Sequence, residues 1–354
     1  MGSLLTETVQ RIAPLDVASM EAARRRQDTL TKPLGSLGRL EELSIQVAGI
    51  SGQMMPRMQH KAIVVMAGDH GVAAQGVSLY PQGVTAQMVL NFLRGGAAIN
   101  VLARHVGARV VVVDMGVAAE LEPHSGLLQR KVAMGTQDMS LGPAMSLDQA
   151  IQAIETGIQV VNDEISQGLD MVGTGDMGIA NTTPSSAIAA AMTGAPVARV
   201  TGRGTGIGDA QWQHKVAVIE RVLAVNHPNP ADPLDVLAKV GGFEIGGLAG
   251  VILGAAAQRR VTIIDGFISG AAALIACGLA PQARDYLVAA HNSAEVGHAA
   301  ILEHLGLRPL LNLDLRLGEG TGAALAMPLV EAAVKILAEM ATFGEAGVST
   351  ANHK

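Results

Sequence analysis

Apolar runs of strand length alternate with segments of helical periodicity through the middle of the chain. The runs lie at residues 62–67, 109–114, 169–173, 261–265, 286–290 and 310–315. The helical segments include residues 85–106, 147–167, 184–192 and 246–258. Continuous β-branched runs are typical of strands covered on both faces, and the alternation with helices favours right-handed βαβ units. We therefore predict an α/β fold with a parallel sheet that binds ligands at the carboxyl ends of its strands.

The two ends of the chain show helical periodicity without strands, over residues 1–58 and 324–345. We predict that they pack together as a smaller helical domain, residues 1–59 plus 324–354. The remaining residues, 60–323, would form the α/β domain that holds the ligand. A chain of 354 residues can build a large core, and two independent domains are not required.

Composition narrows the class of partner. Aromatic residues make up 2% and glycines number 42, so the core must consist of small aliphatic side chains in close contact. A net charge of -6 without a basic run argues against nucleic acid and anionic membranes. The apolar stretch 245–257 is shorter than the ~20 residues that span a bilayer. No signal peptide is evident, and the single cysteine, Cys277, excludes an intrachain disulfide. We expect a cytoplasmic protein with a small-molecule partner and an inert, buried thiol.

A glycine-rich segment, residues 173–184, follows one apolar run and precedes an alanine-rich helical pattern. It predicts a strand, a glycine turn and a helix start, where backbone N–H groups and the helix N-terminus suit a phosphate. Pro184 is expected at the first helical position, after a cap at Thr182 or Thr183. Asp176 would repel an anion, so we expect it to face a sugar hydroxyl, a ring nitrogen or a developing cation.

Two further polar clusters follow predicted strands. Asp69 and His70 could form an acid/base pair, but neighbouring side chains on a strand point to opposite faces, so we favour a structural or positioning role. Glu319 lies between glycines before an apolar helical segment. Burial there would raise the pKa of its carboxyl and suit a general base. The alternative, an acid stabilised by the dipole at a helix N-terminus, is equally open.

Other clusters point to anions and exclude a simple metal site. The glycine run 202–209, with Arg203 and the later Lys215, suits a second anion contact or a charged surface loop. No Cys/His pair has ligand spacing, and His-Glu-x-x-His is absent, so we predict no metal.

Four classes of nucleotide-binding protein are alternatives for this sequence. The spacing Gly173-x-Gly175-x-x-Gly178 matches the dinucleotide fingerprint of an NAD-dependent oxidoreductase, but the acidic residue expected about 20 positions later is missing. A P-loop is excluded because its motif is absent, and the run 110–114 lacks the paired acids of enzymes that use pyrophosphorylated ribose. A non-enzymatic nucleotide-binding protein stays open, although it would not need Glu319.

Motifs along nearly the whole chain together resemble the nicotinate-nucleotide:5,6-dimethylbenzimidazole phosphoribosyltransferase family. They lie at residues 32–42, 68–72, 175–183, 202–206, 241–245, 265–269, 291–295 and 315–322. The resemblance implies a Rossmann-like three-layer sheet, a small helical lobe made from both chain ends, and a homodimer. It also implies transfer of phosphoribose from nicotinate mononucleotide to a benzimidazole nitrogen, with inversion at C1′ and without a cofactor. The product would be α-ribazole 5′-phosphate for the nucleotide loop of cobalamin.

The resemblance also assigns roles to residues. Glu319 matches the general base, whereas Asp176 stands where the family commonly has Glu, so a direct catalytic role of its shorter side chain is open. The predicted base pocket consists of Ser78, Tyr80, Gln87 and Leu317. The predicted mononucleotide site consists of Gly173, Gly175, Gly178, Gly204, Lys215 and Ser293. The remaining candidates for substrate binding are Asn181, Thr182, Asp265, Arg316 and Gly318.

Overall fold

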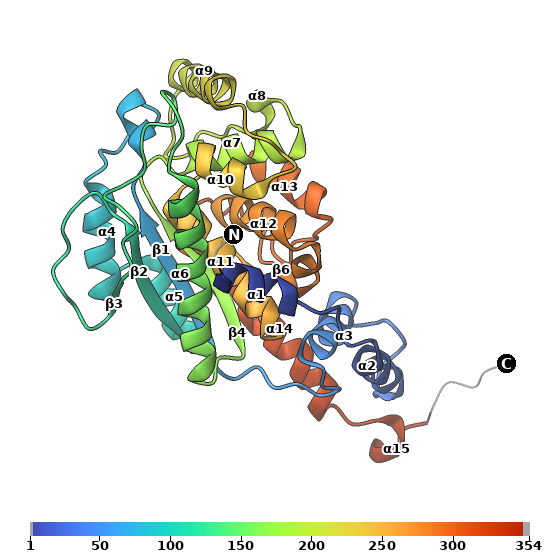
Figure 1. Ribbon diagram of the computed structural model, residues 1–354. Coiled ribbons are helices and arrows are strands. Elements are labelled where there is room, and N and C mark those ends of the chain that lie inside the picture. The colour runs from blue at the N-terminus through green and yellow to red at the C-terminus, as the bar shows by residue number, and fades with distance from the viewer. Residues whose placement is uncertain (1–2, 350–354) are drawn as a thin grey trace.

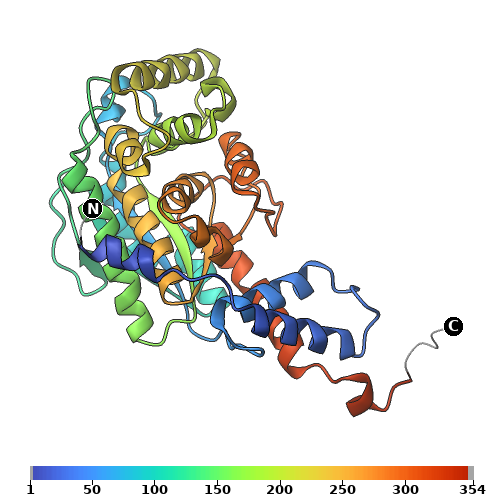
Figure 2. The same cartoon turned by 45° about the vertical axis from the view of Figure 1, so that its right-hand side comes forward.

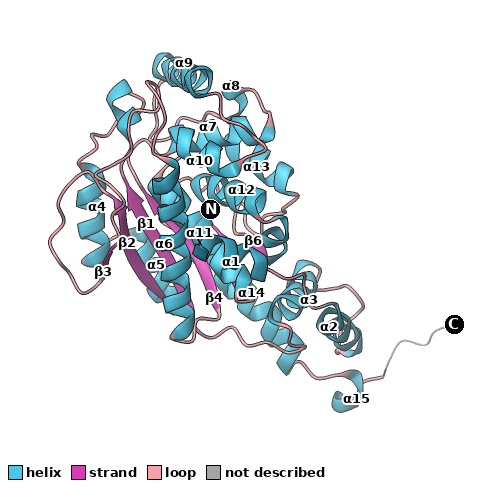
Figure 3. Ribbon diagram, viewed as in Figure 1, coloured by secondary structure: helices cyan, strands magenta, loops and turns pink. Residues whose placement is uncertain are grey.

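A single parallel sheet forms the centre of the computed structural model, which describes residues 3–349 (Figures 1 and 3). Its strands are β1 (Lys61–Gly68), β2 (Ala108–Gly116), β3 (Leu127–Gln129), β4 (Met171–Met177), β5 (Val261–Ile264) and β6 (Leu287–Ala289). All neighbours pair in parallel, in the order β3-β2-β1-β4-β5-β6. This is the strand order of the Rossmann fold, in which connections leave in opposite directions from the middle of the sheet. The α/β prediction is confirmed, and a crevice is expected between the carboxyl ends of β1 and β4.

The helices have the following bounds: α1 (Ser3–Arg11), α2 (Val17–Thr29), α3 (Arg39–Ser51), α4 (Val84–Leu93), α5 (Ala98–Val106), α6 (Leu147–Ser166), α7 (Thr182–Thr193), α8 (Val197–Val200), α9 (Asp209–Asn226), α10 (Pro233–Val240), α11 (Phe243–Ala257), α12 (Phe267–Leu279), α13 (Gly297–Leu305), α14 (Thr321–Glu339) and α15 (Phe343–Ala346). Short 3₁₀ segments lie at Gly71–Gln75 and Pro281–Tyr286. Helices α11 and α12 pack on one face of the sheet, with α6 against α11, while α5 and α14 pack on the other face (Figure 1). The sheet is therefore the middle of three layers.

The contact between α6 and α11 explains the high glycine and low aromatic content. A Cβ atom on Gly157 of α6 would overlap the backbone of α11, and one on Gly250 of α11 would overlap the backbone of α6. The two helices can approach this closely only because both positions lack a side chain. This close approach agrees with the small-residue core expected from the composition.

One strand prediction and one turn prediction need correction. The apolar run at residues 310–315 is not a strand, since only Leu311 forms an isolated parallel bridge, with His291. Asp314 has φ 54°, which turns the backbone out of the extended conformation. The glycine segment is also misplaced: Gly173 and Gly175 lie inside β4, and the turn begins only at Gly178. Prediction of a glycine turn at the first two positions is therefore wrong.

The predicted helices at 147–167 and 246–258 are confirmed, but two others differ. The segment 85–106 forms two helices, α4 and α5, separated at Gly95, where φ is 74°. Helix α7 begins at Thr182 with Asn181 as its N-cap, which makes no side-chain cap bond, so Pro184 is the third helical residue. The predicted threonine cap before Pro184 is therefore wrong.

The helices α2 and α3 and the end of α14 pack together beside the sheet (Figure 2). Ala23, Ala48 and Leu337 form a small apolar cluster there, and the Arg26 guanidinium donates to the carbonyl of Leu337 at 2.6 Å. Helix α1, in contrast, packs against α6 and α11 of the α/β core. The domain division stays a prediction, and its residues 1–2 and 350–354 lie outside the described chain.

Helix α14 and Cys277 bear on two expectations from the composition, namely the lack of a membrane span and an inert, buried thiol. Helix α14 is long and apolar enough to cross a membrane by length and composition, yet 56% of its apolar window is buried inside the molecule, as in a core helix. Cys277 is only partly buried on α12. Burial nevertheless raises the pKa of its thiol to about 12, which keeps the thiol protonated and unreactive.

Candidate active site

A cleft of about 560 Å³ opens where the turns after β1, β4 and β5 meet the segment before α14. Loops at the carboxyl ends of parallel strands are the usual ligand site of this fold. Predicted site residues that line the cleft are Ser78, Tyr80, Asp176, Gly178, Asn181, Thr182, Gly204, Ser293, Arg316, Leu317, Gly318 and Glu319. The tertiary structure thus gathers residues that are as much as 241 positions apart in the chain, from Ser78 to Glu319.

Five predicted residues do not line the cleft: Gln87, Gly173, Gly175, Lys215 and Asp265. Gln87 is exposed on α4, while Val84 and Met88 of the same helix do line the cleft. Gly173 and Gly175 belong to β4, as described above. Lys215 and Asp265 are buried directly behind lining residues, so each contacts the cleft wall instead of the cleft.

Glu319 lies in a strained turn at the cleft wall. Its φ of 62° is unusual for a residue with a side chain, and only 5% of the residue is exposed. One carboxylate oxygen, Oε2, accepts from the backbone N–H of Ile99 at 3.2 Å, at the N-terminus of α5. In the described part of the chain, Oε1 has no hydrogen-bond partner. Burial raises the pKa of the carboxyl, while the Ile99 N–H works in the opposite direction.

Glu319 therefore combines both alternatives that the sequence left open. It is a carboxylate at a helix N-terminus, but the helix is α5 and not α14, which follows it in the chain. The bond to Ile99 holds one oxygen in place, so the other is available to a ligand in the cleft. A buried carboxyl with a raised pKa is suited to accept a proton near neutral pH.

Asp176 lies close to the end of β4, next to the turn that carries Glu319. Its Oδ2 accepts from the side-chain amide of Asn181 at 2.9 Å. Burial, followed by repulsion from Asp265, raises its pKa well above the usual value, so the protonated form is favoured. A neutral carboxyl can donate a hydrogen bond to a sugar hydroxyl and does not repel a phosphate.

Asp265 holds the turn of Glu319 from behind. Its two carboxylate oxygens accept from the backbone N–H groups of Gly320, at 3.2 Å, and Ala323, at 3.0 Å. These N–H groups belong to the start of α14, so Asp265 caps that helix from another element. Burial raises the pKa of Asp265 to about 7, against the effect of these bonds. The geometry thus makes Asp265 a support of the Glu319 turn.

A cationic group stands at another wall of the cleft. The ammonium of Lys215, on α9, donates to the Thr182 hydroxyl at 2.6 Å, and Thr182 is the first residue of α7. Burial lowers the pKa of Lys215 to about 8, although the carboxylate of Glu295 raises it. Gly204 lies against the Thr182 hydroxyl and the ammonium. A helix N-terminus, a lysine and a backbone without a side chain together suit a phosphate.

Another part of the cleft is apolar and open. Tyr80 and Leu317 are both more than half exposed at its rim, and Ser78 lies beside them. Val84 and Met88 of α4 add apolar surface that the sequence analysis missed. This part of the cleft suits a flat apolar ring with a polar edge.

Other residues missed by the sequence analysis are His291 and Glu295, which also line the cleft. Both belong to the motif 291–295, from which the sequence analysis selected only Ser293 for the site. Among the described residues, no group of three or more His, Cys, Asp or Glu side chains is arranged to hold a metal ion.

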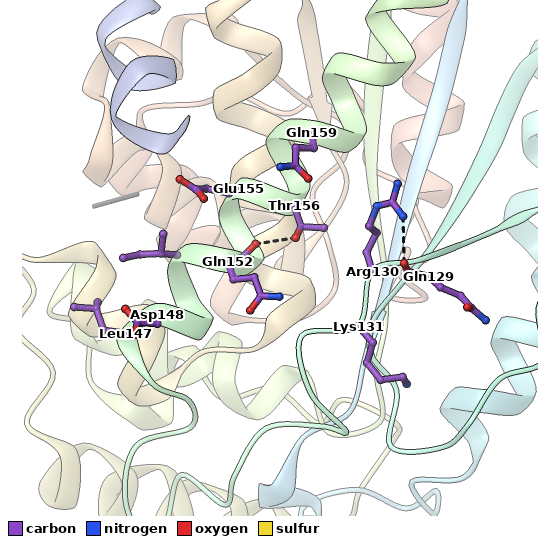
Figure 4. A pocket seen from close by; sticks show the side chains of 10 residues that line it. Gln129, Arg130, Lys131, Leu147, Asp148, Gln152, Glu155, Thr156 and Gln159 are labelled. Carbon is purple, nitrogen blue, oxygen red and sulfur yellow. Dashed lines mark hydrogen bonds between the residues drawn. The ribbon is translucent and has the colours of Figure 1, made fainter. Parts of the chain in front are cut away.

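A second hollow, of about 710 Å³, lies between α6 and the segment after β3 (Figure 4). Two of its charged groups, Lys131 and Glu155, already have partners. Lys131 contacts the Asp114 carboxylate at 2.9 Å, and Glu155 accepts from the backbone N–H of Leu5 at 3.0 Å. Thr156 donates to the carbonyl of Gln152. No predicted site residue lines this hollow, so the cleft at α7 is the candidate active site.

Known proteins resemble this chain over almost its full length. A family model described as phosphoribosyltransferase matches residues 12–348. Proteins named nicotinate-nucleotide–dimethylbenzimidazole phosphoribosyltransferase from Chloroflexus aggregans and Roseiflexus castenholzii are 67% and 66% identical, each match covering 98% of both chains. This chain belongs to the nicotinate-nucleotide–dimethylbenzimidazole phosphoribosyltransferase family. The crystal structure of CobT from Thermus thermophilus has a TM-score of 0.92 and 49% identity, over 94% of this chain and 100% of that one.

Membership of this phosphoribosyltransferase family resolves the alternatives left open by the sequence. The chain is a transferase that acts on small molecules, and the NAD-dependent oxidoreductase is not favoured. The resemblance inferred from the motifs is confirmed at the level of the family.

Proposed function

We propose that this protein transfers the phosphoribosyl group of nicotinate mononucleotide to 5,6-dimethylbenzimidazole, giving α-ribazole 5′-phosphate and nicotinate for the nucleotide loop of cobalamin. The observation that carries the proposal is the position of Glu319, a buried carboxylate with one free oxygen at the wall of a cleft. The phosphate binds at the start of α7 near Lys215, and the benzimidazole ring binds at the apolar wall of Tyr80 and Leu317. The names of the relatives agree with both substrates.

The reaction needs little activation of the leaving group. Nicotinate in the mononucleotide is already a pyridinium, so it leaves with the electron pair of the glycosidic bond and becomes a neutral ring. Glu319 takes the N–H proton of the benzimidazole as the other ring nitrogen forms the bond to C1′. Attack opposite to the leaving group inverts C1′. Positioning of the two substrates and stabilisation of positive charge on the ribose supply most of the rate.

The carboxyl of Asp176 has a different part in this proposal. Because its pKa is raised far above the usual range, it stays protonated and donates to a ribose hydroxyl. Asp265 supports the Glu319 turn, and Gly178 and Asn181 border the mononucleotide. Gln87 is assigned to the base pocket only by resemblance, since its side chain is exposed on α4.

A homodimer is the second part of the proposal. Apolar side chains at or next to the lining of the cleft are more than half exposed, namely Leu79, Tyr80 and Leu317. A second copy of the chain would cover them, as apolar patches at protein interfaces are covered. Light scattering during gel filtration distinguishes a mass near 73 kDa, about twice the 36.3 kDa of the chain, from a monomer. A cytoplasmic location also remains a prediction.

The transferase is tested with purified protein, nicotinate mononucleotide and 5,6-dimethylbenzimidazole. Chromatography and mass spectrometry should detect nicotinate and ribazole phosphate, and NMR should show the α configuration. Glu319→Gln removes the base and should abolish most of the product. Glu303→Gln changes an exposed carboxylate on α13 and serves as a matched control. Absence of product with the native protein would refute the function, and full activity of Glu319→Gln would refute the mechanism.

A further inference from the structure

The turn between β4 and α7 forms part of the cleft in a strained conformation. Ala180 has φ 73°, in the left-handed region, although it carries a side chain and is 5% exposed. Such a conformation costs about 1–3 kcal/mol and persists only where surrounding contacts hold it. The next residue, Asn181, donates its side-chain amide to Asp176, so the shape of the turn also determines where that carboxyl lies.

A buried hydrogen-bond chain reaches this turn from behind. The hydroxyl of Thr85, on α4, accepts from the backbone N–H of Ile179 at 3.1 Å and donates to Oδ1 of Asp69 at 2.7 Å. The other oxygen of Asp69 accepts from the N–H of Ala118 at 2.8 Å, beyond the end of β2. Thr85 is 0% exposed and Asp69 2% exposed, so water does not replace these bonds. The chain thus connects a strand end of the sheet with the amide of a cleft residue.

A second buried contact supports the same turn. His70 and Glu244 form a pair at 2.8 Å, fully buried behind Gly178. Removing either partner would leave the other as a buried group without its counter-charge, which is costly. Of these two contacts, the one through Thr85 ends in a hydrogen bond to the backbone of the turn, so a change at Thr85 acts on the turn directly.

We propose that Thr85 is a positioning residue of the transferase: its hydroxyl fixes the amide of Ile179 against Asp69 and so holds the 178–181 turn in the conformation that binds nicotinate mononucleotide. This inference rests on the proposed function, which places the mononucleotide at that turn. Thr85 itself does not line the cleft, so it acts on the substrate only through the turn. In this proposal, Asp69 of the motif at residues 68–72 acts by holding the hydroxyl of Thr85 in place.

The test compares Thr85→Val, which keeps the shape but removes the hydroxyl, with Thr85→Ser, which keeps the hydroxyl. Thr85→Val should lower kcat/KM for nicotinate mononucleotide about tenfold or more, because a displaced substrate-binding turn acts on binding and on alignment. Thr85→Ser should stay within about threefold of the native protein, as expected where the hydroxyl and not the methyl group matters. Calorimetry with nicotinate mononucleotide alone should show that Thr85→Val binds it more weakly than Thr85→Ser and the native protein do.

A matched control separates this effect from a general loss of stability. Thr156→Val removes a hydroxyl from a largely buried residue of α6 that does not line the cleft, and should leave kcat and KM unchanged. Thr85→Val that is less stable but has native kcat, KM and affinity would overturn the proposal. Equal losses in Thr85→Val and Thr85→Ser would overturn it as well. Native protein that neither binds nor converts the substrates refutes the proposed function instead, so the two failures are distinguishable.

Discussion

Gly175 offers a direct test of how closely the sheet and the Glu319 turn are fitted. A Cβ atom added at this position of β4 would lie 2.5 Å from the carbonyl oxygen of Glu319, 2.8 Å from its carbonyl carbon and 3.0 Å from the nitrogen of Gly320. All three are backbone atoms, so no side chain can rotate away. Ordinary carbon contacts begin near 3.5 Å, and the turn must therefore move by about 1 Å in Gly175→Ala.

We expect a movement of this size to lower the catalytic rate more than it lowers the stability of the fold. Displacing a catalytic group by about 1 Å costs roughly 100-fold in rate, whereas overpacking costs about 1–3 kcal/mol of stability. We expect Gly175→Ala to remain folded at 25 °C with kcat lowered about 100-fold. Alanine is otherwise acceptable in the extended backbone of β4, so the close contact is the cause of the loss.

The assay measures kcat with both substrates saturating, together with the midpoint of thermal unfolding. Gly344→Ala is the matched control, because Gly344 is exposed on α15 and a Cβ there meets nothing within 4 Å. The control should have native kcat and equal or greater stability. A Gly175→Ala protein with native kcat would refute the inference that the backbone of β4 sets the position of Glu319.

Three further predictions concern charges. In Glu319→Gln, kcat should fall by about 100-fold or more, and the acidic limb of the kcat/KM profile, which reflects its raised pKa, should disappear. Asp265 has a pKa of about 7 when folded against 3.8 when unfolded, so the folded state binds an extra proton between these values. The free energy of unfolding should therefore fall as pH rises from about 4 to 7. Urea unfolding at several pH values should show a weaker dependence of this free energy on pH in Asp265→Asn. Arg26→Ala removes bonds to the last carbonyls of α14 and should cost about 1–3 kcal/mol in urea unfolding. Arg25→Ala, at an exposed neighbouring position, should cost less than 1 kcal/mol, and equal losses would contradict this role of Arg26.

Local sequence patterns were reliable where the structure depends on neighbouring residues. The β-branched runs of β1 and β2 predicted central strands, because such side chains suit an extended backbone buried on both faces. The same reasoning failed at residues 310–315, where an apolar run finds almost no strand partner. Strand β3 was missed because three residues carry too little pattern.

The sequence by itself determined the α/β class, the family and most residues at the carboxyl edge of the sheet. It could not determine which of these residues meet, because hydrogen bonds between distant segments leave no local pattern. Only the tertiary structure decided that Glu319 contacts Ile99, 220 positions earlier, and that Asp265 supports its turn. It also decided that Gly175 lies inside β4 and packs against that turn. These contacts depend on how the layers pack, because packing brings together residues that are far apart in the sequence.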